Sequence, residues 1–263
     1  MSFQRGRPSA HDTQNQYARQ AAHYAESSLH GRGESLETVR RLAAATGSDT
    51  VLDLGTGTGF TAFAVASDAA RVIAADLTPE MLQLARHLAL EKGLDAKLEW
   101  TLAAAESLPF ADNTIPVITC RYASHHFHDL PRALRELARV TQPRGRLVLC
   151  DVVAPEAAEM VELMNRLEQL RDPTHVWDYP LSRWRQELLP SAGFEVQEVV
   201  RGKNPQLFSE WVHRAGTPRD AVVQLNQMFA AASEEAQQAF EVRRQGAEIY
   251  FSWDNATILA VKR

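Results

Sequence analysis

The chain has 263 residues, of which 45% are hydrophobic and 23% charged, and a formal net charge of −5. This size predicts one full hydrophobic core with a small appended region, and the acidic balance argues against nonspecific binding to nucleic acid. No apolar segment is long enough to span a bilayer. The two cysteines, Cys120 and Cys150, are too few for a disulfide framework and favour a reducing, cytoplasmic compartment.

The first half of the chain alternates strands and helices. Residues 1–15 are expected to form a flexible tail and not a secretory signal, because no apolar run follows their arginines. The expected helices are 14–26, 33–46, 60–67, 79–92 and 130–141, and the expected strands are 50–54, 71–76, 97–102, 114–120 and 145–153. Such alternation predicts a parallel sheet with helices on both faces.

The second half has a different pattern. The expected elements are helices at 157–170 and 182–191, a strand at 193–200, a mostly helical region at 205–244 and a last strand at 257–261. No helix follows the last strand, so we expect it to run antiparallel to its neighbours. The sequence therefore predicts an α/β fold with a doubly wound, mostly parallel seven-stranded sheet, an antiparallel last strand and a small helical cap.

Residues 51–60 are the most informative segment. An apolar run ends in Asp53 and then in three glycines at alternate positions, Gly55, Gly57 and Gly59. Because this segment joins a predicted strand to a predicted helix, it predicts a nucleotide-like ligand at the carboxyl edge of the sheet. Glycine lets the backbone turn sharply and lets a ligand approach, and the helix N-terminus directs free N–H groups toward it. The Gly-x-Gly-x-Gly spacing disfavours a nicotinamide dehydrogenase.

A second acid follows about twenty residues later, at the end of the next predicted strand. Asp76 in this position can accept both ribose hydroxyls of an adenosine. The alternative is a solvated Asp that caps the helix beginning near Pro79. Strand, loop, helix and acid agree, and we therefore adopt the ribose interpretation.

Several motifs in this order resemble class I S-adenosylmethionine-dependent methyltransferases. They are the segment 51–59, Asp76, and the segments 104–110, 120–127 and 139–147. The chain is similar to the ubiquinone/menaquinone-biosynthesis group, and above all to the YcgJ-like bacterial methyltransferases, from about Tyr17 to its end. The resemblance implies a Rossmann-like methyltransferase fold. It also implies S-adenosyl-L-methionine as cofactor and S-adenosyl-L-homocysteine as product.

The resemblance also implies a division of the chain and a set of cofactor contacts. Residues 16–153 would form the cofactor-binding core with N-terminal lid helices, and residues 154–263 the substrate side, with the cap at about 203–246. The implied cofactor residues are Asp53, Gly55, Thr56, Gly57, Gly59, Asp76, Leu77, Ala105, Glu106 and Arg121. The family usually has an Asp where this chain has Ala104, and the lost bond to the adenine amino group costs about 1 kcal/mol.

Three histidines are candidate general bases, because the imidazole pKa lies near neutrality. His126 is the first choice, followed by His125 and His175. The pair His125-His126 also fits a role in shaping its loop. The density of ligand types between His125 and Asp129 suggests a metal site, but no further Cys/His cluster completes a set, so we predict no metal.

Candidate substrate contacts lie in two segments. The loop at 171–179 follows the carboxyl side of the sheet and offers Arg171 and Trp177, or it is an Asp-Pro turn with a capping His. Tyr17 and Tyr24 are expected either in a lid, as the resemblance suggests, or in simple core contacts. Four tryptophans in the second half fit core packing and an aromatic substrate wall equally well: Trp177, Trp184, Trp211 and Trp253.

These observations predict transfer of the S-adenosylmethionine methyl group to a small, partly apolar acceptor through oxygen, carbon or nitrogen. We expect no membrane partner. RNA methylation is an alternative, because Arg132, Arg135 and Arg139 share a helix face, although the interleaved Glu136 favours a solvated face. Non-methyl chemistry with the same cofactor and cofactor binding without turnover also fit these motifs. The acceptor, the oligomeric state and any lid movement are left open by the sequence.

Overall fold

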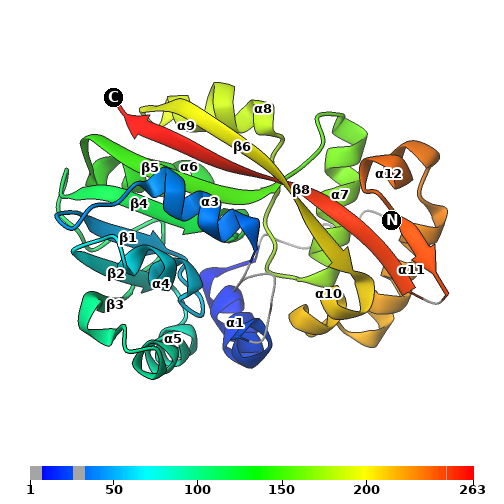
Figure 1. Ribbon diagram of the computed structural model, residues 1–263. Helices are drawn as coiled ribbons and strands as arrows, with labels where there is room; N and C mark the ends of the chain where they lie inside the picture. The colour runs from blue at the N-terminus through cyan, green and yellow to red at the C-terminus, as the bar shows by residue number, and fades with distance from the viewer. Residues whose placement is uncertain (1–7, 26–32, 247) are drawn as a thin grey trace.

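The computed structural model describes residues 8–25, 33–246 and 248–263. In these residues one sheet carries helices on both sides (Figure 1). The strands are β1 (Thr50–Leu54), β2 (Arg71–Asp76), β3 (Leu98–Leu102), β4 (Ile115–Arg121), β5 (Thr141–Val153), β6 (Phe194–Leu207), β7 (Arg243–Gln245) and β8 (Glu248–Lys262). The helices are α1 (Ala10–Ala25), α3 (Glu34–Ala43), α4 (Phe60–Ala66), α5 (Pro79–Glu91), α6 (Leu130–Val140), α7 (Ala158–Arg171), α8 (Leu181–Arg183), α9 (Leu189–Ser191), α10 (Phe208–Ala215), α11 (Arg219–Ala231) and α12 (Glu234–Ala239).

The sheet has the predicted topology. Its strand order is β3-β2-β1-β4-β5-β8-β6, in which the first five strands are parallel and β8 runs antiparallel to both of its neighbours. The short strand β7 pairs with β8 outside this path and makes the sheet eight-stranded, where the sequence predicted seven. All three residues of β7 are polar and exposed, so this strand has no apolar pattern by which to predict it.

The strands are buried on both faces. In β1, Val51 packs into a cluster with α3 and α4, while Leu52 and Leu54 pack into another with α6, α8 and α9. Successive side chains of a strand point to opposite faces, so a strand covered on both sides reads as a continuous apolar run. Because β1 to β5 are parallel, their carboxyl ends lie at the same edge of the sheet.

The cap is built on the long outer ends of β6 and β8. In Figure 1 the helices α7, α10, α11 and α12 gather around these ends, away from β1 to β4. A separate core holds them together, with Trp211, Phe229, Phe251 and Trp253 among its buried side chains. The last strand begins at Glu248, nine residues before the predicted start, because the alternate apolar residues that precede position 257 extend it.

Helix α1 begins at Ala10, so residues 10–15 are helical where the sequence predicted a tail. Ser9 and Asp12 cap this helix reciprocally: Ser9 Oγ accepts the Asp12 N–H at 3.3 Å, and Asp12 Oδ2 accepts the Ser9 N–H at 2.8 Å. The helix lies between α5 and α10 (Figure 1). Gln14 Nε2 donates to the Leu77 carbonyl at 2.8 Å, and Gln16 Nε2 donates to the Ala215 carbonyl at 2.7 Å. The helix thus joins the sheet edge to the cap.

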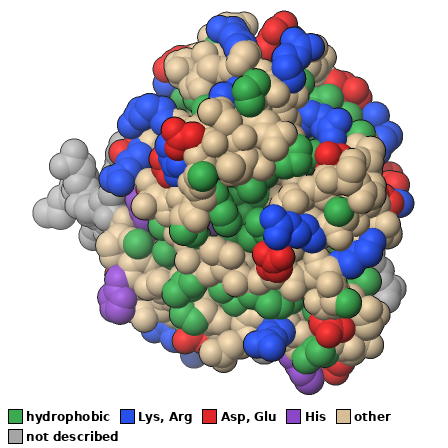
Figure 2. Space-filling model, turned by 90° about the vertical axis from the view of Figure 1, so that its left-hand side faces the viewer, with side chains coloured by type: hydrophobic (Ala, Val, Ile, Leu, Met, Phe, Trp, Pro, Cys, Tyr) green, Lys and Arg blue, Asp and Glu red, His purple; other side chains and the backbone are tan. Residues whose placement is uncertain are grey.

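The surface carries charges of both signs. Figure 2 shows one face on which basic and acidic side chains lie interspersed. On α6, Arg139 donates to Glu136 and Asp112, which neutralises part of the basic helix face considered for RNA. Within the described ranges, we find no helix whose length and apolar character would allow it to cross a bilayer.

Candidate active site

The glycine loop turns directly after β1. Gly55, Gly57 and Gly59 have φ angles of 66°, 54° and 88°, in a region that residues other than glycine rarely adopt. A Cβ on Gly55 would overlap the Cβ of Ala123, whereas a Cβ on Gly57 would meet nothing within 4 Å. Gly55 therefore permits a close approach inside the protein, and Gly57 faces open space.

Asp76 connects this loop to the end of β2. Its Oδ2 accepts the Gly57 N–H at 2.8 Å, and its Oδ1 accepts the Thr78 N–H at 2.9 Å. Burial raises the pKa of this carboxyl, and the two backbone N–H groups oppose the shift. The carboxyl is thus fixed in position beside the glycine loop.

Asp53 lies underneath the loop. Its two oxygens accept the hydroxyl hydrogens of Thr56 and Thr119, each at 2.7 Å. Burial raises the pKa of Asp53 to about 6 against the effect of these two hydrogen bonds. The side chain therefore supports the loop through Thr56.

A hollow of about 970 Å³ opens at this edge of the sheet, and we call it the cofactor hollow. Eight of the ten predicted cofactor residues line it: Gly55, Thr56, Gly57, Asp76, Leu77, Ala105, Glu106 and Arg121. Asp53 and Gly59 do not. Gly59 is the N-cap residue of α4, and a Cβ there would lie 2.5 Å from the Phe63 ring. The lining also includes Met81, Phe127 and His128, which the sequence did not single out for the cofactor.

Two of the lining residues also hold neighbouring segments in place. Glu106 Oε1 accepts the N–H groups of His128 and Asp129, at 2.9 and 3.2 Å, and so fixes the start of α6. Arg121 donates from Nε to the Thr61 hydroxyl at 3.1 Å and so connects β4 to α4. Both contacts keep the hollow open between rigid elements.

His126 lies in a short turn after β4, at the inner edge of the hollow. Its Nδ1 is 3.1 Å from the Thr174 carbonyl oxygen, which can only accept, so Nδ1 carries the hydrogen. Its Nε2 consequently accepts the hydroxyl hydrogen of Tyr17, at 2.5 Å. Burial, together with the positive charge of His125, lowers the pKa of His126 to about 4. His126 is therefore a neutral hydrogen-bond acceptor at physiological pH.

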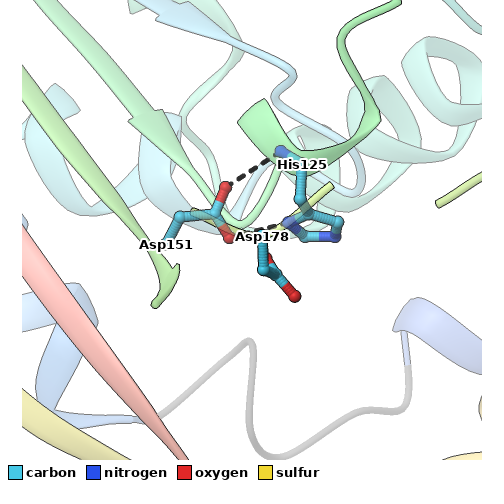
Figure 3. Close-up of side chains that lie close together, drawn as sticks. All are labelled: His125, Asp151 and Asp178. Carbon is cyan, nitrogen blue, oxygen red and sulfur yellow. Dashed lines mark hydrogen bonds and ion pairs between the residues drawn. The ribbon is translucent and has the colours of Figure 1, made fainter. Parts of the chain in front are cut away.

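His125 has the opposite character. Its Nδ1 donates to Asp151 Oδ1 at 2.7 Å, and Asp178 lies beside this pair (Figure 3). Burial acts to lower the pKa of His125, but the charge and hydrogen bond of Asp151 outweigh it and raise the pKa to about 9. His125 is therefore a cation whose ring centroid lies 4.2 Å from that of neutral His126.

His125, Asp151 and Asp178 also bring three possible metal-ligand atoms within 4.8 Å of one another. The hydrogen bonds of Asp151 argue against a metal there. Its oxygens accept from the His125 ring, the His125 N–H, the Ser124 hydroxyl and the Val152 N–H. A carboxylate with four donors has its lone pairs occupied, so the cluster fits an ion pair better than a metal centre.

Three further residues predicted for the site line neither hollow or cannot be placed. His175 is 3% exposed, bonds to Asn165 through Nε2 at 2.8 Å and lines neither hollow described here, so it occupies a scaffold position and not the catalytic one that we expected. The Trp177 N–H donates to the His125 carbonyl, and its side chain packs on the cap core instead of facing a substrate hollow. The Tyr24 side chain lies outside the described part of the structure.

A second hollow, of about 510 Å³, lies on the cap side of His126, and we call it the polar chamber. Its lining comes mainly from elements far apart in the sequence: Tyr17, Tyr122, His125, His126, Val152, Glu168, Arg171, Asp178, Asn204, Gln206, Trp211, Arg214 and Trp253. Tyr17, Tyr122 and His126 line both hollows and form their shared wall. The predicted Arg171 is here, whereas Glu168, Asn204, Gln206 and Arg214 had no sequence pattern to mark them.

The sequence matches known methyltransferases. Residues 52–149 match a family described as a methyltransferase domain. The chain is 35% identical to the uncharacterized methyltransferase YcgJ of Bacillus subtilis (strain 168) over 249 residues, which cover 94% of this chain and 98% of that protein. It is 38% identical over 109 residues to the ubiquinone/menaquinone biosynthesis C-methyltransferase UbiE of Enterobacter sp. (strain 638), covering 40% of this chain and 43% of UbiE.

Solved structures agree with this assignment. The crystal structure of the YcgJ protein from Bacillus subtilis has a TM-score of 0.83 at 36% identity and covers 87% of this chain and 98% of that one. A putative methyltransferase from Bacillus halodurans C-125 also has a TM-score of 0.83, at 30% identity, over 88% of this chain and 99% of the other. The chain therefore belongs to the class I S-adenosylmethionine-dependent methyltransferases, in the group that includes YcgJ.

Proposed function

We propose that the protein transfers the methyl group of S-adenosylmethionine, held in the cofactor hollow, to a small-molecule acceptor in the polar chamber by in-line displacement. The observation that carries this proposal is the shared wall. His126 and Tyr17 border both hollows, so a reacting group at His126 would face the two compounds at once. Holding two reactants in line in this way supplies a large part of the rate acceleration.

The cofactor hollow has the features that this cofactor requires. The Asp76 carboxyl lines this hollow and supplies acceptor oxygens suited to ribose hydroxyls, and the space next to Gly57 is open. Ala104 lines it in place of the acid that the family usually has. When bound, S-adenosylmethionine supplies an electrophilic methyl group on a positively charged sulfur.

His126 is the proposed general base for an acceptor that must lose a proton. Its neutral Nε2 accepts the Tyr17 hydroxyl hydrogen, so an O–H or N–H group of the acceptor can bind Nε2 only after Tyr17 moves away. An acceptor hydroxyl or amine that replaced Tyr17 would pass its proton to Nε2, while the Thr174 carbonyl holds the hydrogen on Nδ1. Tyr17 would then cover the site from α1 as part of a lid.

Calorimetric titration with S-adenosylhomocysteine tests the cofactor site. We expect Asp76→Asn to weaken binding by about 10- to 100-fold, because hydrogen bonds to a charged group contribute about 1.5–3 kcal/mol. Asp68→Asn is the matched control, since Asp68 is paired with Arg40 away from the hollow. Equal affinity of the Asp76→Asn variant and the wild type would reject the assignment of the ribose site.

A transfer assay tests the acceptor class. The protein is mixed with methyl-labelled cofactor and either a metabolite extract or bulk RNA. We expect label in small molecules, in keeping with the polar chamber and the partly neutralised arginines of α6. Label only in RNA would reject the proposed acceptor class. Tight cofactor binding without transfer of label to any extract would support a protein that binds the cofactor without turnover.

A further inference from the structure

Among the described residues that line the polar chamber, Asp178 has the one carboxyl group with an oxygen that lacks a hydrogen-bond partner. The residue is 3% exposed, and its Oδ1 has no hydrogen-bond partner. Its backbone is fixed, because its N–H donates to Asn165 Oδ1 at 2.6 Å and its carbonyl accepts from Asn165 Nδ2 at 3.0 Å. An unsatisfied buried polar atom destabilises the folded protein, and a ligand bonded to it would remove this cost.

The two further carboxyls in or behind the chamber wall are occupied. Glu168 accepts from the Trp253 indole at 2.6 Å and from Arg171 at 3.2 Å. Asp151 is held by the ring of His125. Asp178 is therefore the carboxyl group in the chamber lining that still has an oxygen to bond with a ligand.

The charges of the chamber favour an anion. Burial raises the pKa of Asp178 well above its usual range and so favours the protonated carboxyl, which is a hydrogen-bond donor. Where Asp178 is protonated, the three cations His125, Arg171 and Arg214 outnumber the two carboxylates Glu168 and Asp151 by one positive charge. Such a lining attracts an anion and repels an ammonium group.

Arg214 supplies a suitable donor geometry. It reaches the chamber from α10, and its Nη2 donates to Gln206 Oε1 at 2.8 Å. Gln206 in turn donates to Asn204 Oδ1 at 2.8 Å, so the guanidinium is oriented by a chain of neutral amides. The planar guanidinium fork matches a carboxylate. Trp211 and Trp253 add flat apolar surface for the remainder of a small molecule.

We propose that the methyl acceptor carries an anionic oxygen group, of the carboxylate class, and that Asp178 and Arg214 bind this group in the polar chamber. The inference rests on the proposed methyl transfer and narrows its acceptor class. It assigns Asp178 and Arg214 to acceptor specificity, and leaves cofactor binding to the residues of the cofactor hollow.

Three probes of equal size and different charge test the inference: 3-hydroxybenzoate, 3-hydroxybenzamide and 3-hydroxybenzylamine. Their binding to the protein saturated with S-adenosylhomocysteine is followed by tryptophan fluorescence, because Trp211 and Trp253 line the chamber, and by calorimetry. We expect the acid to bind at least about ten-fold more tightly than the amide, and the amine to bind most weakly, as one charge-assisted hydrogen bond predicts.

Variants then locate the effect. Arg214→Gln should remove most of the preference for the acid, whereas Arg219→Gln, an exposed arginine on neighbouring α11, should keep it. Asp178→Asn retains an N–H donor, so it should lower the affinity for 3-hydroxybenzoate less than Asp178→Leu does. Amide or amine binding as tight as that of the acid would overturn the inference, as would a preference that survives Arg214→Gln or the failure of all three probes at about 10 mM.

The same samples separate this inference from the function on which it rests. Each variant is titrated with S-adenosylhomocysteine alone. Loss of this binding in the wild type would refute the cofactor site and the proposed function with it. Normal cofactor binding without a preference for the acid would refute the acceptor class only.

Discussion

The cofactor hollow and the polar chamber meet at one wall, but they are constructed from different parts of the chain. The first includes many glycine, alanine and threonine residues in the turns where β1, β2, β3 and β4 end. The second is formed by long polar side chains from α7, β6, α10 and β8. A site made of backbone tolerates few added atoms, whereas a site made of side chains changes its chemistry with each substitution. The cofactor should therefore depend on main-chain geometry, and the choice of acceptor on single side chains.

The largest effect expected from this comparison is that of Gly55→Ala. The added Cβ would overlap Ala123, and a left-handed non-glycine residue costs about 1–2 kcal/mol in addition. The loop must then shift, and a displacement of about 1 Å at a site lowers activity by about 100-fold. We expect a loss of S-adenosylhomocysteine affinity of at least this size by calorimetry.

Gly93→Ala is the matched control for Gly55→Ala. Gly93 has a φ of 67°, nearly the same as that of Gly55, but a Cβ there would meet nothing within 4 Å, and it lies outside the hollow. This variant should lose stability and keep cofactor affinity. If both variants bound the cofactor equally well, the idea of a backbone-built site would be wrong.

The next effect belongs to the shared wall. His126→Gln keeps an acceptor for the Tyr17 hydroxyl but cannot take up a proton, so we expect a loss of about 100-fold in kcat with cofactor affinity nearly unchanged. A base acts only when it is unprotonated, and the pKa of His126 is about 4. Protonation of His126 should therefore leave the wild-type rate unchanged from about pH 6 to 8 and lower it only toward pH 4.

The exposed His87 provides the control for that substitution, since 67% of its side chain is accessible. His87→Gln should transfer methyl groups at the wild-type rate. An unchanged kcat in His126→Gln would show that the acceptor reacts without a base at this position, and would leave the wall with a purely steric role.

Sequence patterns predicted the sheet well because its strands are buried on both faces. Continuous apolar runs such as β1 and the punctuation by glycine and acid residues are local features, and the cofactor hollow is built from them. The errors lie where local patterns are weak. The polar β7, the capping pair Ser9 and Asp12, and the alternating start of β8 were not predicted.

The polar chamber could not be predicted in the same way. Its residues come from segments that only the tertiary fold brings together. Arg171 was predicted as a substrate contact, but Asp178 and Arg214 appear in the sequence as ordinary polar residues. His175 illustrates the opposite error. It lies in a promising loop, but its ring turns toward Asn165 and away from both hollows, which no spacing rule reveals.

A smaller effect should come from the back wall of the chamber, where His125 pairs with Asp151. The folded-state pKa of about 9 lies above the usual 6.5, so the stabilisation is complete below pH 6.5 and is lost as the pH rises to 9. A shift of this size corresponds to about 3 kcal/mol. In urea unfolding, the stability difference between wild type and His125→Asn should shrink by about this amount between about pH 6 and 9.

His87→Asn again serves as the reference, because substitutions at exposed side chains usually change the free energy of unfolding by less than about 0.5 kcal/mol. A difference between wild type and His125→Asn that does not change with pH would mean that the ion pair does not form in solution. The electrostatic contrast between the two neighbouring histidines would then be lost.

The smallest effect is expected at Tyr122, the third residue of the shared wall. Its hydroxyl accepts from Asn255 Nδ2 at 3.0 Å and donates to Ser35 Oγ at 3.4 Å, and so connects β8 to α3 behind both hollows. Tyr122→Phe should lower the free energy of unfolding by about 1 kcal/mol and change methyl transfer only a few-fold. Tyr250→Phe, at a side chain that is 40% exposed, should change neither. A loss of transfer in Tyr122→Phe as large as that in His126→Gln would mean that the phenol contacts the reacting groups. Tyr122 would then take part in the reaction, in addition to separating the two hollows.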